Sequence, residues 1–211
     1  MGTMFFSERG NCSLCGQEKM KSHGLCVYCL ESLEFVYGRE KTGQVYTDYF
    51  LFANDFFRRY FYSFKFFSKT YLAVAFARLL VTEGEKRNLF KNVDAIIPIP
   101  MHPEAQRQRG YNQVLLLAEE VYKMTGIPVY GTLKKIRETK RQHHLSLRDR
   151  RENVKDAFCF KGENDGKRFL LLDDFVTTGS TMEEAAKAVL KGNGRIAGAM
   201  ALASTTHPMF P

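Results

Sequence analysis

The chain has 211 residues, 45% of them hydrophobic, which is enough to bury one substantial core and carry a small appendage. Lysine and arginine number 31 against 23 acidic residues, and the net charge of +8 favours an anionic ligand or a polyanionic partner without choosing between them. No stretch reaches membrane-spanning length, and the N-terminus lacks a secretory signal, so we expect a cytoplasmic protein. A GxGxxG fingerprint and a Walker lysine are absent, which disfavours ATP binding through a P-loop.

Four cysteines near the N-terminus form two Cys-x2-Cys pairs separated by ten residues; they are Cys12, Cys15, Cys26 and Cys29. This spacing is typical of a structural zinc knuckle or ribbon, in which four thiolates leave no open position for water. Two disulfides or a redox dithiol are alternatives, but the expected reducing compartment disfavours them. We predict a zinc module over residues 1–40, a hinge over residues 38–43 and a second domain over residues 44–211.

Aromatic residues dominate the segment that follows. Residues 45–52 predict a strand, and the aromatic positions of residues 56–67 recur at helical steps with basic residues between them. Such a stripe is able to stack on nucleic-acid bases. The i, i+3, i+4 spacing nevertheless favours burial of the rings in the core, with Arg58, Arg59 and Lys65 on the outer side.

The rest of the chain alternates predicted strands and helices, the order of an α/β fold with a mostly parallel sheet flanked by helices. The predicted strands are residues 94–98, 129–135, 156–160, 169–172 and 196–203, and the predicted helices are residues 71–82, 112–124 and 181–191. Strands that end near Pro98, Lys135 and Asp173 are expected to meet at one sheet edge. Ligands of open α/β sheets bind at that edge.

The strand at residues 169–172 leads into two carboxylates and then a turn of small residues that opens a helix. The adjacent carboxylates of Asp173 and Asp174 are suited to accept hydrogen bonds from two vicinal hydroxyls. The turn aims backbone N–H groups at a phosphate, where the helix dipole is positive; it contains Thr177, Thr178, Gly179, Ser180 and Thr181. The alternative is a strand end followed by an ordinary helix cap, which rarely supplies both features at this spacing.

This pattern closely resembles the thirteen-residue motif of the type I phosphoribosyltransferases. The resemblance implies their fold and their ligand, phosphoribosyl pyrophosphate with magnesium. Residues 96–103 leave the preceding strand through three prolines, and this exit resembles the pyrophosphate loop of the same enzymes, although a proline-stiffened strand exit is an alternative. The expected pyrophosphate contacts are Ile99, Pro100, Met101, Arg107 and Arg109, the arginines because their planar fork donates two hydrogen bonds at once.

Several further pieces narrow the resemblance to the ComF family of competence-associated proteins. They occur in the family's order: the four cysteines, Pro98 to Pro100, Arg109 to Gln113, Thr139 with Gln142 and Leu145, Arg150 with Asn153 and Val154, and the phosphoribosyl motif. Each motif alone is a weak to moderate indication of the family, and together the motifs are specific for it. The resemblance implies a role in DNA uptake during natural competence, with single-stranded DNA and a helicase-like protein as partners.

Residues 134–155 contain nine lysines and arginines against three acidic residues, a net charge of +6. In phosphoribosyltransferases a mobile loop at this place closes over the reaction centre and excludes water. The alternatives are a binding surface for single-stranded DNA and a solvent-exposed charged segment without a binding role. The basic residues we assign to this loop are Arg137, Lys140, Arg141, Arg148 and Arg150.

Two functions from different classes therefore stay open. The first is a DNA-uptake factor that binds phosphoribosyl pyrophosphate and handles single-stranded DNA. The second is an active phosphoribosyltransferase for an unidentified nucleobase or amine. Purine-salvage relatives carry an acidic base where this chain has Thr177, which argues against hypoxanthine or guanine as the acceptor.

Overall fold

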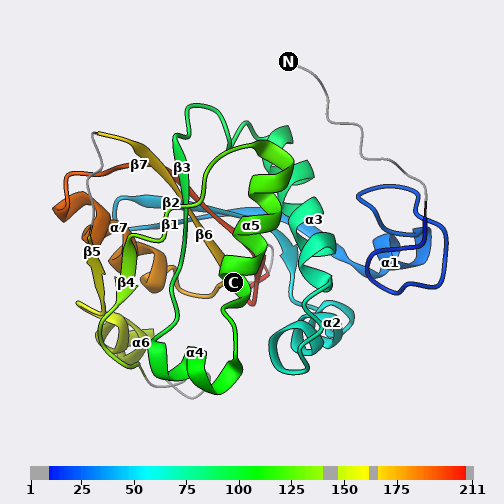
Figure 1. The fold of residues 1–211 in the computed structure, drawn as a ribbon, viewed down its shortest axis with the longest axis horizontal. Coiled ribbons are helices and arrows are strands. Elements are labelled where there is room, and N and C mark those ends of the chain that lie inside the picture. Colours follow the sequence, from blue (N-terminus) through cyan, green and yellow to red (C-terminus); the bar gives the residue numbers. More distant parts are fainter. Residues whose placement is uncertain (1–9, 140–146, 162–165, 208–211) are drawn as a thin grey trace.

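The structure is a computed structural model that describes residues 10–139, 147–161 and 166–207 (Figure 1). A five-stranded sheet has the order β1-β2-β7-β6-β3, and every neighbouring pair in it is parallel except β1 with β2. The fold is α/β with a mostly parallel sheet, as the sequence predicts. The strands of this sheet are β1 (Glu34–Thr42), β2 (Val45–Phe52), β3 (Ala95–Pro98), β6 (Arg168–Val176) and β7 (Arg195–Ser204).

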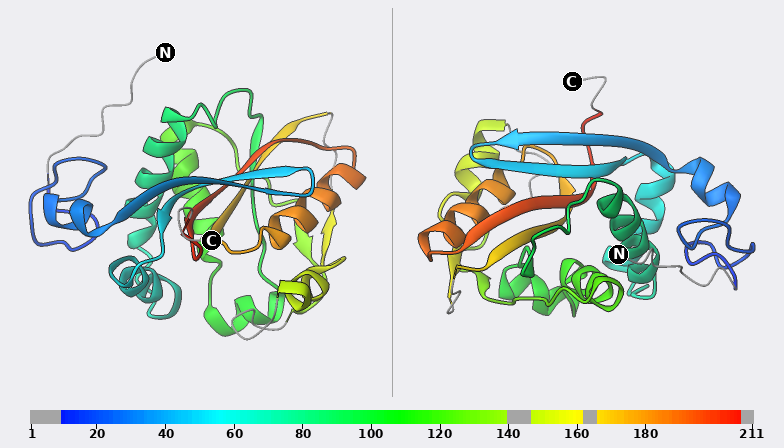
Figure 2. Two further views of the ribbon diagram at one scale, coloured as in Figure 1. Left: turned by 180° about the vertical axis from the view of Figure 1, so that it is seen from behind. Right: turned by 90° about the horizontal axis from the view of Figure 1, so that it is seen from above.

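Helices cover both faces of the sheet (Figure 2). The helices are α1 (Val27–Ser32), α2 (Asp55–Phe66), α3 (Leu72–Lys86), α4 (Pro103–Arg109), α5 (Gln113–Thr125), α6 (Leu147–Val154) and α7 (Ser180–Lys191). Side chains of α2, α3 and α5 share one core cluster with Leu170 and Leu172 of β6. Side chains of α7 share another with Phe169 and Leu171. Successive strand residues point to opposite faces, so the apolar run in β6 serves both clusters.

Two sequence predictions, one of a hinge and one of a strand, are wrong. Residues 38–43 are not a hinge, because β1 runs through Thr42 and pairs with β2 across a short turn that contains Gly43. The strand expected over residues 129–135 is only β4 (Leu133–Lys135), which pairs with β5 (Phe158–Phe160) in a separate antiparallel sheet. Residues 128–130 form a single bridge to Ile96 of β3, and a turn at Gly131 and Thr132 then redirects the chain. The division of the chain near residue 40 stays a prediction.

The aromatic stripe of α2 is divided between core and surface. Phe57, Phe61 and Phe64 are buried, and their rings meet Phe76 of α3 at centroid distances of 5.6–5.7 Å. Core packing of the stripe is confirmed for this face. Asn54 starts the helix, since its side chain accepts a hydrogen bond from the backbone N–H of Phe57.

The N-terminal cysteine-containing segment packs against α3. His23 Nε2 lies 2.7 Å from Glu83 Oε1, and Leu14 and Leu25 are buried in the core cluster that α3 lines. Within the described ranges, no helix has both the length and the apolar character needed to cross a membrane.

Candidate phosphoribosyl site and cysteine cluster

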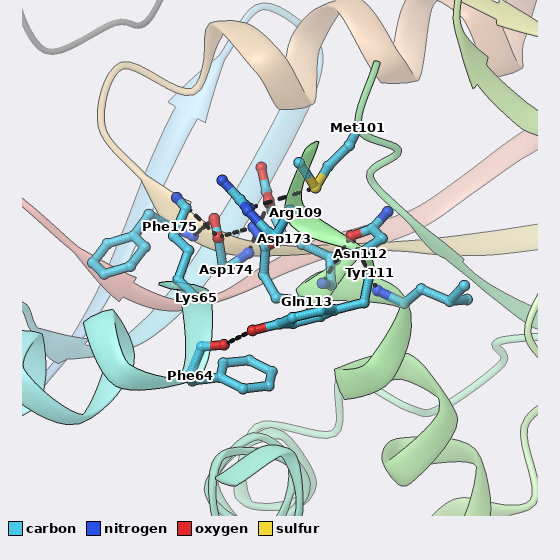
Figure 3. Close-up of polar contacts among 12 residues, drawn as sticks. Phe64, Lys65, Met101, Arg109, Tyr111, Asn112, Gln113, Asp173, Asp174 and Phe175 are labelled. Atoms are coloured by element: carbon cyan, nitrogen blue, oxygen red, sulfur yellow. Dashed lines mark hydrogen bonds and ion pairs between the residues drawn. The ribbon is translucent and has the colours of Figure 1, made fainter. Parts of the chain in front are cut away.

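The acidic pair lies inside β6 instead of following it, because the strand continues to Val176. Asp173 is 9% and Asp174 8% exposed. Asp173 Oδ1 accepts a hydrogen bond from the backbone N–H of Asp174 at 2.8 Å, and the two carboxyl groups lie close enough to interact. Asp174 meets residues of α2 and α5 (Figure 3), while the charge of Asp173 acts on Lys135 of β4.

The carboxylate of Asp174 is held by three groups (Figure 3). Its Oδ2 accepts a hydrogen bond from Gln113 Nε2 at 2.8 Å and lies 3.7 Å from Lys65 Nζ, and its Oδ1 accepts from the backbone N–H of Phe175 at 2.7 Å. Arg109 in turn donates to Gln113 Oε1 at 2.5 Å. A cation and an amide therefore hold Asp174 in place, and Arg109 is positioned beside the acidic pair.

The sequence prediction that Lys65 lies on the outer side of its helix is wrong, since it turns to the buried Asp174. Sequence reasoning assigned no site role to Lys65 or to Gln113. Gln113 was detectable, since it closes the Arg-Gly-Tyr-Asn-Gln segment that carries the family resemblance. Lys65 had no such signal, because only the packing of α2 against α3 and β6 brings it to Asp174.

Burial raises the pKa of Asp173 well above its usual range, and the neighbouring charge of Asp174 raises it further. Burial likewise lowers the pKa of Lys135, while the charge of Asp173 opposes this shift. Burial therefore disfavours the charged form of each group. A ligand with hydroxyls and a cation would make a charged Asp173 more favourable.

A raised pKa makes Asp173 unfavourable to folding at neutral pH. Below the unfolded pKa of about 3.9 the carboxyl is protonated in both states and costs nothing; as pH rises through the folded pKa, the free energy of unfolding of wild type falls. We therefore expect Asp173→Asn to gain stability relative to wild type between about pH 5 and about pH 8, measured by urea unfolding. The control is Asp94→Asn. Hydrogen bonds from Arg168 lower the pKa of Asp94, so Asp94 is ionised in both states across this range. The difference in free energy of unfolding between Asp94→Asn and wild type should therefore not change with pH. If the difference in free energy of unfolding between Asp173→Asn and wild type is also independent of pH, the pKa of Asp173 is not raised.

The turn after β6 is shaped by a glycine. Gly179 has φ +64° and occupies the N-cap position of α7, so this position supplies no side-chain cap for the first N–H groups of the helix. Thr178 Oγ1 and Ser180 Oγ lie 2.8 Å apart, and Thr42 Oγ1 of β1 donates to the carbonyl oxygen of Thr178 at 3.3 Å. Sequence reasoning missed Thr42, which lies far from the turn along the chain. A helix N-terminus of this kind is suited to an anion.

The chain leaving β3 lies beside a cavity of about 650 Å³ that Pro100, Met101, Arg107 and Lys135 help to line. Ile99 is buried and donates its backbone N–H to the carbonyl oxygen of Leu172 at 2.8 Å. The two arginines predicted for pyrophosphate separate. Arg107 lines the cavity and pairs with Glu104, whereas Arg109 faces Met101 and Gln113.

The predicted basic loop is described only in part. Arg137 donates to the backbone carbonyl oxygen of Asn153 at 3.1 Å and to that of Lys155, which ties β4 to the end of α6. Lys140 and Arg141 fall outside the described residues. Arg148 and Arg150 belong to α6, and their side chains fall outside the described residues too.

The Sγ atoms of the four N-terminal cysteines all lie within 4.8 Å of one another, and those of Cys15 and Cys26 are 3.8 Å apart. Zn–S bonds of about 2.3 Å in a tetrahedron place sulfurs about 3.8 Å apart, so the cluster fits a zinc ion. Burial would raise the pKa of Cys15, but hydrogen bonds from the backbone of Glu18 and Gln17 and from neighbouring cysteines lower it to about 7. Burial raises the pKa of Cys26 and Cys29 instead. A thiolate is the form that binds zinc, so the ion would have to displace their protons.

No protein-family model matches the chain. It is 31% identical over 203 residues to competence protein F of Haemophilus influenzae, and the match covers 90% of this chain and 88% of that protein. The chain belongs to the competence protein F (ComF) family. DNA utilization protein YhgH of Salmonella typhimurium is 34% identical over 60% of this chain and 58% of its own length. Competence protein ComFC of Bacillus subtilis is 30% identical over 46% of this chain and 38% of its own length.

Solved structures resemble this ComF-family chain only distantly. Adenine phosphoribosyltransferase of Saccharomyces cerevisiae has a TM-score of 0.42 and 13% identity, covering 80% of this chain and 83% of the enzyme. UMP synthase of Leishmania donovani has a TM-score of 0.41 and 17% identity, covering 65% of this chain and 23% of the enzyme. At TM-scores below 0.5, these likenesses decide nothing about the site.

Proposed function

We propose that this ComF-family protein binds phosphoribosyl pyrophosphate with magnesium in a type I phosphoribosyltransferase-like site. The observation that supports it best is the succession of a buried acidic pair, a left-handed glycine turn and the N-terminus of α7. Asp173 and Asp174 would accept hydrogen bonds from the ribose hydroxyls. The N–H groups of the turn from Thr177 to Thr181 would bind the 5′-phosphate.

The leaving-group side of the proposed site lies between β3 and α4. Ile99, Pro100 and Met101 would face the pyrophosphate, with Arg109 beside the acidic pair and Arg107 at the cavity. Carboxylate oxygens are ligands that Mg²⁺ prefers, so the acidic pair fits this ion. When bound, magnesium would neutralise charge on the pyrophosphate. We further propose that the basic segment of residues 134–155 closes over the ligand.

We propose a biological role in DNA uptake, which rests on the names of the relatives. A cytoplasmic site of action fits four reduced cysteines that would hold a structural zinc ion. Single-stranded DNA and a helicase-like protein would be the partners. The second candidate is a transferase that acts on a nucleobase or amine, and the cavity of about 650 Å³ beside the pyrophosphate loop favours it, since an acceptor needs such a space.

Calorimetry with phosphoribosyl pyrophosphate and magnesium tests the ligand. Wild type should release heat on binding, and Asp173→Asn/Asp174→Asn should abolish that heat, because amides are poorer acceptors for ribose hydroxyls and poorer magnesium ligands. Asp94→Asn is the matched control and should bind as wild type does, because Asp94 precedes β3 and contacts Arg168 at the far end of β6 from the acidic pair. Retained binding by the folded double variant would sink the proposal. Pyrophosphate release that needs an added acceptor would favour the transferase.

A further inference from the structure

The outer face of α2 and the turn after it expose an unusual set of large side chains. Tyr62 is 55%, Phe66 49%, Phe67 64% and Tyr71 60% exposed. Tyr62 contacts both phenylalanines, with ring centroids 4.6 Å from Phe66 and 5.7 Å from Phe67. These three rings and Tyr71 form what we call the aromatic face. The buried side of α2 packs in the core, whereas the aromatic face lies outside the core and is not needed for the fold.

Basic residues share the segment that carries the aromatic face. Residues 56–71 contain four basic side chains and no acidic one; the four are Arg58, Arg59, Lys65 and Lys69. The guanidinium carbon of Arg109 lies 5.2 Å from the centroid of the Phe66 ring, and Lys65 Nζ lies 5.9 Å from it. Cations and exposed rings in alternation complement a polyanion that carries flat bases.

The aromatic face also adjoins the proposed phosphoribosyl site. Lys65 reaches Asp174 at 3.7 Å, and Arg109 reaches the same carboxylate through Gln113 (Figure 3). A strand bound across the rings would therefore place its phosphates near Lys65 and Arg109 at the edge of the acidic pair.

We propose that the aromatic face is the stacking surface for single-stranded DNA, an inference that rests on the proposed role in DNA uptake. Unpaired bases can stack on exposed rings, whereas the bases of a duplex are stacked on one another. A protein partner fits less well, because residues 56–71 carry basic side chains and no acidic one. The inference places DNA on α2, away from the basic segment of residues 134–155 that the sequence favours.

Fluorescence anisotropy with a labelled oligo-dT strand tests this surface. Tyr62→Ala/Phe67→Ala should weaken binding by about 5-fold to 150-fold for each stacked base that is lost. Phe66 is left intact, since its ring lies against Arg109. The control is Tyr46→Ala/Tyr122→Ala, which removes two exposed rings from β2 and α5 and should leave the affinity unchanged. All four positions are exposed, and circular dichroism checks that both variants fold.

A strand of abasic deoxyribose phosphates of equal length separates stacking from charge. Wild type should bind it more weakly than oligo-dT, and Tyr62→Ala/Phe67→Ala should bind both strands alike. Arg59→Gln/Lys69→Gln should instead keep the preference for bases and reduce the slope of log affinity against log salt by about 1.4, or about 0.7 per lost phosphate contact.

Two results would overturn the inference: wild-type DNA affinity in Tyr62→Ala/Phe67→Ala, or equal binding of abasic and dT strands by wild type. If the variant keeps its DNA affinity but loses self-association, the aromatic face is an interface between copies of the chain. Calorimetry keeps this test separate from that of the sugar-phosphate ligand. Tyr62→Ala/Phe67→Ala should bind phosphoribosyl pyrophosphate as wild type does. Wild type that binds oligo-dT through the aromatic face but gives no heat with phosphoribosyl pyrophosphate would overturn that ligand and support this surface.

Discussion

Gly179→Ala should lose most of its affinity for phosphoribosyl pyrophosphate. A Cβ atom at this position would lie 1.9 Å from Thr42 Oγ1 and 2.8 Å from Thr42 Cβ, so the turn and β1 must move apart. The left-handed backbone adds about 1–2 kcal/mol for a residue with a side chain. Displacement of the turn moves the N–H groups that would bind the 5′-phosphate. We expect calorimetry to show an affinity at least about tenfold weaker, equivalent to about 1.4 kcal/mol.

Gly126→Ala is the matched control for this prediction. Gly126 ends α5 with φ +73°, and among the described residues nothing lies within 4 Å of an added Cβ. The variant therefore has the same backbone strain without the clash and should bind the ligand normally. Gly179→Ala/Thr42→Gly removes the clash and should recover part of the affinity. If Gly179→Ala binds as well as Gly126→Ala does, the turn is not the phosphate site.

Removal of zinc should unfold the segment around the four cysteines before the sheet is affected. Structural zinc contributes on the order of 10 kcal/mol to small modules, and this segment is too short to be stable on its own few buried side chains. Cys29→Ser should have a similar effect, because it removes one of four ligands at a fully buried position. Hydrogen exchange measured by mass spectrometry should show loss of protection first within residues 11–33, during titration with a strong chelator.

Cys159→Ser is the control, because Cys159 lies in β5 outside the cluster and is expected to leave metal content unchanged. The His23 contact with Glu83 predicts that the effect spreads next to α3. Equal protection of residues 11–33 with and without metal would refute a structural role for zinc.

Most of the architecture was predictable because it depends on local periodicity. The apolar run before Asp173, the small-residue turn at Gly179 and the helix that follows are contiguous, so their order along the chain determines their order in space. The clustering of the four cysteines was equally predictable, since two tight turns are enough to bring their thiolates together. The predicted helix over residues 112–124 matches α5 within one residue for the same reason.

Contacts between distant segments could not be predicted in this way. Lys65 approaches Asp174 only because the buried rings of Phe57, Phe61 and Phe64 fix the position of α2 beside β6. Thr42 reaches the carbonyl of Thr178 only because β1 adds to the sheet as an edge strand. Spacing along the chain specifies which side chains share a face of one helix or strand. Only the packing of those elements against each other specifies what each face meets, since that depends on the shape and burial of the whole core.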